Sequence, residues 1–174
     1  MGVAATLEKF LKEKQVPFTL LEHQYAEGSF NTAKVANIDD NCLVKAVLLR
    51  DEDFHFMLCA LPSHNKILRH TLNQIFDRHL ELADEEDLQK VFMDCAPGAV
   101  PALGTAYGID VIWDDDLLSQ PELYIEAGDH IHLIKIPSTS FAEILTNAMH
   151  EKFSADRKRH TSLPKKYIRQ EYEL

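Results

Sequence analysis

Two apolar segments separated by a short acidic turn constrain the fold of this chain more than any other feature. The first, residues 42–50, is apolar almost throughout and is interrupted by Lys45. The second, residues 54–61, follows the acidic stretch 51–53. Such a pair predicts a β-hairpin, and nearly continuous apolar strands are typical of a sheet that is covered on both faces. We therefore expect a sheet with other elements packed on each side.

The rest of the hydrophobic pattern alternates between helices and short strands. Helices are expected at about 6–14 with Thr6 as N-cap, 32–37, 65–76, 84–92 with an acidic first turn, and 140–153, the last beginning with the capping box Ser140-Phe-Ala-Glu143. Further strands are expected at 18–22, 80–83, 109–113, 122–127 and 131–136. The resulting prediction is an α+β fold: a curled, mostly antiparallel sheet of six to seven strands, flanked by helices.

The length and composition indicate a folded domain and argue against a disordered or membrane-spanning chain. With 174 residues, 45% of them hydrophobic and 26% charged, the chain is long enough for one domain with a real core and too apolar for a disordered segment. No apolar run approaches the roughly 20 residues that span a bilayer, and the first residues do not have the pattern of a secretory signal. Cys42, Cys59 and Cys95 lie far apart without a CxxC motif. The expectation is a cytoplasmic protein with reduced thiols, outside the membrane.

The charge is unevenly distributed. Residues 1–149 carry 11 Lys or Arg against 24 Asp or Glu, whereas residues 150–174 carry 7 against 4. Because neutralisation of phosphates supplies most non-specific affinity for nucleic acids, the acidic part is a poor general binder of them. A nucleic-acid role would need a local basic patch or a small pocket. We therefore divide the chain into a domain, 1–153, and a basic C-terminal tail, 154–174, which either contacts phosphates or is a solvated terminus.

Two features could carry chemistry in the first two thirds of the chain. An unpaired ammonium is costly to bury, so Lys45 either extends its head to solvent or points into a polar cleft. The segment Pro97-Gly-Ala-Val-Pro101 contains Gly98, which permits a close approach of the backbone to a ligand. Its amides could donate to an anion or oxyanion, although the segment could also be a simple turn. Cys95 beside it is expected to be buried and inert.

A third candidate is the stretch Ala127-Gly-Asp-His130-Ile-His132. On a regular strand His130 and His132 would share one face. A metal site would need a third ligand, and no third motif presents itself. These histidines could therefore be metal ligands or hydrogen-bonded structural residues, and both interpretations stay open. No cofactor is predicted.

Several of these segments, taken in order, resemble a known family. The segments are Val44-Lys45-Ala-Val-Leu-Leu, Ala60-Leu-Pro62, Leu82-Ala-Asp-Glu-Glu-Asp-Leu88, Asp94-Cys95-Ala-Pro-Gly-Ala-Val-Pro-Ala-Leu-Gly104, Tyr107-Gly-Ile and Glu126-Ala-Gly-Asp-His130. Over roughly residues 15–150 they are similar to the YbaK/ProX family, the bacterial aminoacyl-tRNA deacylases related to the editing domain inserted in prolyl-tRNA synthetase.

The resemblance implies a pocket for the 3′ end of a mischarged tRNA, typically a proline tRNA, and hydrolysis of the ester of a wrong, small amino acid. It also implies prolyl-tRNA synthetase as a partner. The family lysine corresponds to Lys45, the glycine–proline loop to residues 98–101 and the histidine to His130. The expected catalytic residues are Lys45, His130, Gly98 and Ala99. The expected substrate-binding residues are Phe30, Val100, Pro101 and Asp129.

The chain also departs from the family pattern. Pro97 and Val100 replace the first glycine and the serine of the common Gly-Gly-x-Ser-Pro loop, and Asp129 stands where serine is common. These differences bear on the identity of the amino acid more than on the reaction. A non-catalytic module that binds an aminoacyl or nucleotide group is the alternative function, and a metal-dependent hydrolase built on His130 and His132 is a third. The sequence leaves the oligomeric state open.

Overall fold

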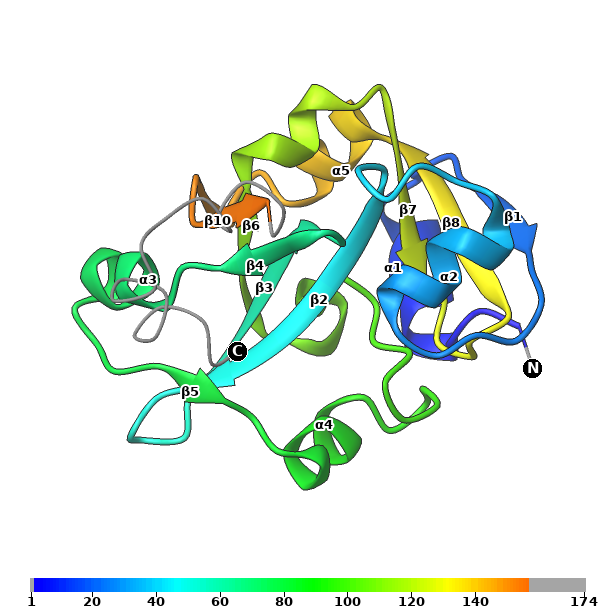
Figure 1. Ribbon diagram of the computed structural model, residues 1–174. Helices are drawn as coiled ribbons and strands as arrows, with labels where there is room; N and C mark the ends of the chain where they lie inside the picture. Colours follow the sequence, from blue (N-terminus) through cyan, green and yellow to red (C-terminus); the bar gives the residue numbers. More distant parts are fainter. Residues whose placement is uncertain (1, 157–174) are drawn as a thin grey trace.

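The computed structural model describes residues 2–156, which fold around one mixed β-sheet flanked by helices (Figure 1). The helices are α1 Ala5–Glu13, α2 Ser29–Ala36, α3 Arg69–Phe76, α4 Glu85–Val91 and α5 Ser138–Ile144, with the 3-10 helices η1 Gly104–Tyr107 and η2 Asp115–Ser119. The strands are β1 Thr19–Glu22, β2 Leu43–Arg50, β3 Phe56–Pro62, β4 Asn65–Ile67, β5 Glu81–Leu82, β6 Asp110–Asp114, β7 Glu122–Glu126, β8 His132–Pro137, β9 Met149–Glu151 and β10 Ser154–Asp156. In the described part, none of the helices has the length and apolar character needed to traverse a bilayer.

The main sheet has eight strands in the order β1-β8-β7-β2-β3-β6-β9, with β5 paired to β2. The predicted hairpin is confirmed, because β2 and β3 pair antiparallel with Val44 opposite Pro62 and Arg50 opposite Phe56. The expectation of six to seven mostly antiparallel strands is wrong. The pairs β2–β7, β3–β6 and β6–β9 are parallel. Parallel pairs need long crossover connections, and no local sequence signal shows where a chain returns after one.

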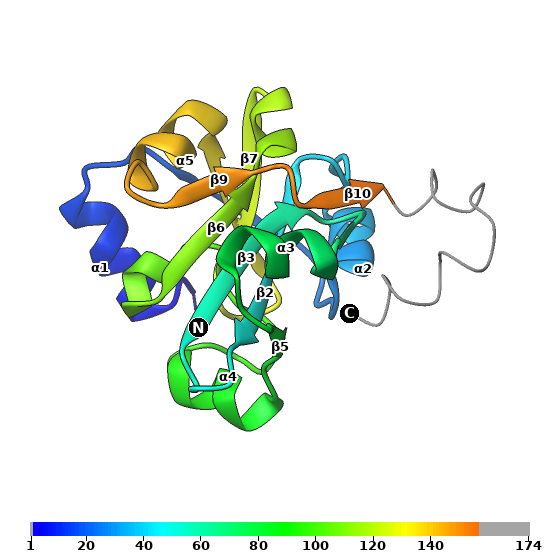
Figure 2. The same cartoon turned by 90° about the vertical axis from the view of Figure 1, so that its left-hand side faces the viewer.

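The C-terminal part also differs from the expectation of one helix from Ser140 to Phe153. Helix α5 begins at Ser138, whose backbone N–H donates to Pro121 O at 3.2 Å, so Ser140 lies inside the helix and does not cap it. The chain then forms β9 beside β6 and β10 beside β4 (Figure 2). Residues 154–156, which the sequence analysis places in the tail, therefore belong to a strand. The rest of the predicted tail lies outside the described residues.

The starts of α4 and α1 show one correct and one incorrect expectation. Helix α4 has the expected acidic first turn, and Asp84 is its N-cap, with its Oδ1 accepting from Asp87 N at 2.9 Å. Thr6 does not cap α1, because the N-cap is Ala4. Asp94, far along the chain, accepts instead from Thr6 N at 2.8 Å. A distant carboxylate thus satisfies a free N–H at the start of α1.

Both faces of the sheet are covered, as the apolar strands predict. One face carries the largest core cluster, to which α1, α5 and alternate residues of β2 contribute. The opposite face carries two smaller clusters, one with Leu72 of α3 and one with Ala33 of α2. Along β2, Val44 and Leu48 belong to the large cluster, so Lys45 points to the opposite face between the two smaller clusters.

Candidate active site

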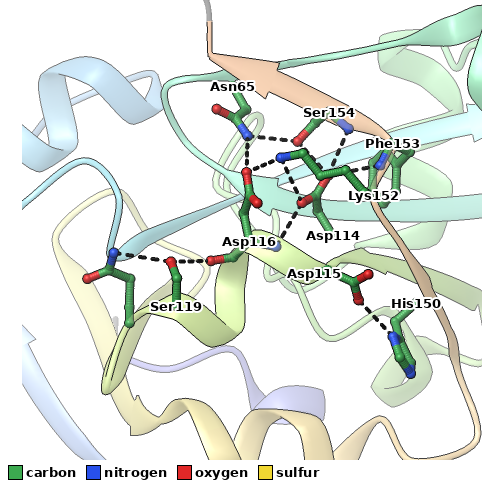
Figure 3. A network of polar contacts seen from close by, with 10 residues as sticks. Asn65, Asp114, Asp115, Asp116, Ser119, His150, Lys152, Phe153 and Ser154 are labelled. Carbon is green, nitrogen blue, oxygen red and sulfur yellow. Dashed lines mark hydrogen bonds and ion pairs between the residues drawn. The ribbon is translucent and has the colours of Figure 1, made fainter.

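Lys45 is partly buried on β2, and its ammonium group is hydrogen-bonded above the sheet. Its Nζ donates to the backbone oxygen of Asn65, the first residue of β4, at 2.6 Å. The Asn65 side chain is fixed in turn, because its Nδ2 donates to Ser154 Oγ at 2.9 Å and to Asp116 Oδ2 at 3.3 Å (Figure 3). The strand β4 therefore holds the head of Lys45 over the face that carries α2 and α3.

A buried aspartate joins this part of the sheet to the C-terminal strands. Asp114 is fully buried at the end of β6, and its Oδ2 accepts from Phe153 N at 3.1 Å, Ser154 N at 2.7 Å and Ser154 Oγ at 2.6 Å (Figure 3). Its Oδ1 accepts from Asp116 N at 2.9 Å and lies 3.6 Å from Lys152 Nζ, so both oxygens of this buried carboxylate have partners. The Asp114 network therefore fixes Ser154, which holds the side chain of Asn65.

His130 lies in the turn between β7 and β8, with a backbone φ of 62° and only 3% of its surface exposed. Its Nε2 is 2.8 Å from Pro97 O. Because a carbonyl oxygen only accepts, the proton of the neutral ring lies on Nε2, and Nδ1 keeps a lone pair. That Nδ1 is buried and has no hydrogen-bond partner. The edge-on ring of Tyr25 covers His130, with ring centroids 5.4 Å apart.

The glycine–proline loop meets this histidine, as the sequence analysis expects. Gly98 has a φ of 83°, a conformation that favours glycine, and a Cβ placed there would lie 3.6 Å from His130 Cε1. The Ala99 N–H donates to Ala96 O at 3.0 Å and is thus used within a turn. The part of both amides as donors to a substrate stays a prediction.

Asp129, which the sequence analysis assigns to substrate binding, instead holds the β7–β8 turn together. Its Oδ1 accepts from the backbone N–H groups of Ile131 and His132 at 3.0 and 2.9 Å, and its Oδ2 lies 2.7 Å from His132 Nδ1. Burial acts to raise the pKa of Asp129, but the bonds from His132 and Ile131 hold it below its ordinary value. Both carboxylate oxygens therefore have partners within the turn, and a part of Asp129 in substrate binding stays a prediction.

The other expected substrate-binding residues lie on two elements. Phe30 is 75% exposed on α2. Val100 packs, partly buried, against the large core cluster, and Pro101 is buried. Their part in substrate binding stays a prediction.

The histidine pair is not part of a cluster of metal ligands in residues 2–156. In this part of the chain, a single group of three or more His, Cys, Asp or Glu brings its ligand atoms within 4.8 Å of one another. That group is Asp51, Asp53 and His55, in the turn between β2 and β3. Asp51 Oδ1 accepts there from the backbone N–H groups of the other two at 2.9 Å, so it closes the hairpin turn.

Cys95 has the environment expected of an unreactive thiol. Burial raises its pKa to about 11, and its Sγ lies 3.3 Å from Tyr107 Oη. A thiol with so high a pKa is almost fully protonated at neutral pH and is a poor nucleophile.

Sequence reasoning missed Glu126, the last residue of β7. The parallel register pairs Val44 with Ile125, so Lys45 and Glu126 follow on neighbouring strands and point to the same face. Thr32 of α2 donates to Glu126 Oε1 at 3.3 Å, and Oε2 is buried with no partner. Burial raises the pKa of Glu126 to about 7, and nearby His130 acts to lower it. Glu126 stands in the motif that ends at His130, but its neighbours follow from a parallel pairing that no local pattern shows.

Solved structures share this arrangement of strands and helices at low sequence identity. The hypothetical protein APE2540 superposes with a TM-score of 0.77 at 17% identity, over 86% of this chain and 99% of its own. A protein described as a candidate trans-editing enzyme for prolyl-tRNA synthetase gives 0.74 at 18% identity, over 87% and 96%. A candidate signal transduction protein from Marinobacter aquaeolei VT8 gives 0.71 at 17% identity, over 87% of this chain and 30% of its own. These likenesses define the fold.

The family follows from the sequence match. The family model of the aminoacyl-tRNA editing domain matches residues 26–144, from the loop before α2 to the end of α5. The chain therefore belongs to the aminoacyl-tRNA editing domain family, the family of YbaK, which confirms the resemblance. The search of curated proteins gives no match.

Proposed function

We propose that the chain is a trans-editing deacylase that hydrolyses the ester between a wrong, small amino acid and the 3′ end of a proline tRNA. The observation that carries the proposal is the contact of His130 with Pro97 O and Gly98. This contact lies at the end of β7, next to the strand that bears Lys45. Membership of the editing family supports the reaction, and the resemblance to the prolyl-tRNA editing proteins supports the substrate.

The chemistry suits these residue types. An aminoacyl ester is already activated, so its hydrolysis needs a positioned water and stabilisation of the oxyanion, without a covalent nucleophile. The water oxygen attacks the carbonyl carbon, the bond from that carbon to the ribose oxygen breaks, and the ribose oxygen takes a proton. Lys45 supplies positive charge toward the ribose, phosphate or carbonyl oxygen, and the Gly98 amide donates to the carbonyl oxygen. His130 orients the water or the amino group of the substrate.

Selection among amino acids would work as a size sieve. One methylene group in an apolar pocket changes binding by only about 1–3 kcal/mol, which is why small residues need a second, editing site. Phe30 and Val100 are the proposed walls of this sieve. The proposal needs no cofactor, takes the aminoacylated 3′ end of tRNA as substrate, and places the enzyme in the cytoplasm with prolyl-tRNA synthetase as a partner.

The test is a panel of mischarged tRNAs, with release of free amino acid measured over time. Multiple turnovers on at least one member are expected, and Lys45→Ala and His130→Ala should each lower the rate by about 10²–10³-fold, the usual effect of removing one oxyanion donor. Lys135→Ala is the control, because Lys135 forms an exposed ion pair with Glu122 on β7. Binding of aminoacyl-tRNA without turnover would refute catalysis and favour the non-catalytic module. Full activity of either site variant would remove that residue from the site.

A further inference from the structure

Two buried acceptor atoms belong to one short segment, residues 126–130, which ends β7 and forms the turn after it. Glu126 Oε2 and His130 Nδ1 are both inaccessible, and neither has a hydrogen-bond partner. Glu126 ends β7, and His130 lies in the turn that follows it. Buried polar atoms in proteins are nearly always hydrogen-bonded, and unsatisfied ones need an explanation. Two unsatisfied acceptors in one short segment indicate a shared partner that is bound in the working state.

The surrounding contacts fix the chemical role of both atoms. Pro97 O accepts a hydrogen bond from His130 Nε2, so Nδ1 of the neutral ring is an acceptor. Thr32 donates to Glu126 Oε1, which leaves Oε2 free to accept. The missing partner must therefore bring at least two donor hydrogens. Because Glu126 is a carboxyl group away from solvent, a cationic donor satisfies it better than a neutral one.

The position of the pair permits a ligand to reach it. Tyr25, whose ring covers His130, is 62% exposed, and Gly98 on the other side is exposed. Exposed residues therefore border His130. A small group at the end of a larger substrate would reach the two acceptor atoms beside the loop that is proposed to hold the ester carbonyl.

We propose that Glu126 Oε2 and His130 Nδ1 bind the α-ammonium group of the aminoacyl ester. This inference rests on the proposed function and specifies its substrate class: esters of amino acids with a free amino group, as opposed to N-acylated or peptidyl esters. An ammonium carries three donor hydrogens and a positive charge, so it can donate to both atoms while it compensates the carboxylate. An N-acyl group removes the charge and leaves a single donor, so Glu126 would stay unpaired.

The experiment uses ligands that the enzyme cannot cleave. Adenosine that carries alanine through an amide at its 3′ position and the N-acetyl derivative of the same compound differ only at the amino group. Titration calorimetry near neutral pH should show that the free amine binds the wild-type chain at least about tenfold more tightly, because a charge-assisted hydrogen bond is stronger than a neutral one. Glu126→Gln should bind both compounds about equally, with the affinity for the N-acetyl compound unchanged.

The control and the second variant separate this role from a general effect on folding. Glu122→Gln removes a carboxylate on the same face of β7 that forms an exposed ion pair with Lys135, and it should keep the preference for the amine. Glu126→Asp keeps the charge and should retain part of the preference. Circular dichroism confirms that each variant is folded.

Three results would overturn the inference: equal binding of the two compounds by the wild type, binding of neither, or a full amine preference in Glu126→Gln. The third result, combined with loss of ester hydrolysis, would assign Glu126 to activation of the water instead. The outcome is separate from that of the proposed function. Absence of turnover on the tRNA panel refutes the deacylase but leaves an amine preference measurable, and turnover without such a preference refutes only the ammonium site.

Discussion

Replacing Asp114 with alanine tests whether the buried network at the end of β6 fixes both the C-terminal strands and the partner of Lys45. The carboxylate is fully buried and accepts three hydrogen bonds on Oδ2, from Phe153 N, Ser154 N and Ser154 Oγ (Figure 3). Alanine leaves all three donors without an acceptor. Ser154 then loses the contact that orients it toward Asn65, whose carbonyl accepts from Lys45.

The size of the effect follows from these bonds. A buried donor left unsatisfied costs about 1–3 kcal/mol, and breaking a buried charged network costs about 3–5 kcal/mol in all. For a chain of this size, each kcal/mol shifts Tm by about 2–4 °C. We therefore expect Asp114→Ala to lower the free energy of unfolding by about 4 kcal/mol and Tm by about 10 °C. The deacylation rate of the folded variant should also fall.

Thermal unfolding followed by circular dichroism measures the first effect, and initial deacylation rates well below the variant's Tm measure the second. Asp115→Ala is the matched control, because Asp115 is the next residue but forms only an exposed ion pair with His150. Such pairs contribute about 0–1 kcal/mol. If Asp114→Ala unfolds within about 3 °C of the control, on the same scale of Tm shifts, the network does not stabilise the fold as argued. A normal deacylation rate of Asp114→Ala would show that the network is not needed to position Lys45.

Four further predictions follow from single features. In urea unfolding, Gly128→Ala should destabilise the fold by about 2–4 kcal/mol, because its φ is 114° and the new Cβ would lie 2.9 Å from Ala4 Cβ. Gly108→Ala, with open space around the new Cβ, should cost only about 1 kcal/mol in the same measurement. Because burial raises the pKa of Glu126 to about 7, above its value of 4.5 when unfolded, the wild type loses stability as pH rises from about 4.5 to 7. In thermal unfolding, Glu126→Gln should therefore be more stable than the wild type by about 2 kcal/mol at pH about 8 and by little at pH about 5. Equal gains at both pH values would contradict the burial of this carboxyl. Truncation after Asp156 should weaken tRNA binding and reduce its salt slope by about 0.7 for each phosphate that the tail neutralises, and an unchanged slope in filter binding would exclude a role of the basic tail in binding phosphates. Excess chelator should leave the deacylation rate unchanged, and a loss of activity that zinc restores would revive the metal-dependent alternative.

The part of the fold that the sequence predicts well depends on local patterns. The hairpin β2–β3 is correct because two apolar runs flank a short acidic turn, and α4 is correct because Asp84 is both an N-cap and the start of an acidic first turn. The capping box at Ser140 fails because Pro121 O, from a distant segment, satisfies the N-terminus of α5 two residues earlier. Strands of three residues, such as β9 and β10, are too short to show a period in the sequence.

The candidate site also contains some features that local patterns predict and others that depend on distant segments. The contact between the loop at Gly98 and His130 could be predicted because a positive φ favours glycine and because the resemblance fixes their order. The hydrogen bonds of Ala99 and Asp129 within local turns could not be predicted, because they are visible only in three dimensions. The roles of these four residues in the site stay predictions. Glu126 was missed because its proposed role depends on which strand lies beside β7.

The two proposed roles together orient the substrate across β2 and β7. Lys45 is held toward β4 by Asn65, and Glu126 is held toward α2 by Thr32, although both start from neighbouring strands on one face. Their opposite charges are therefore directed apart. An aminoacyl nucleotide has a matching polarity, with an ammonium at one end and phosphates at the other. With its ammonium at Glu126 and its ribose and phosphates toward Lys45, its ester carbonyl would fall between them. The reversed orientation would place like charges together at both ends.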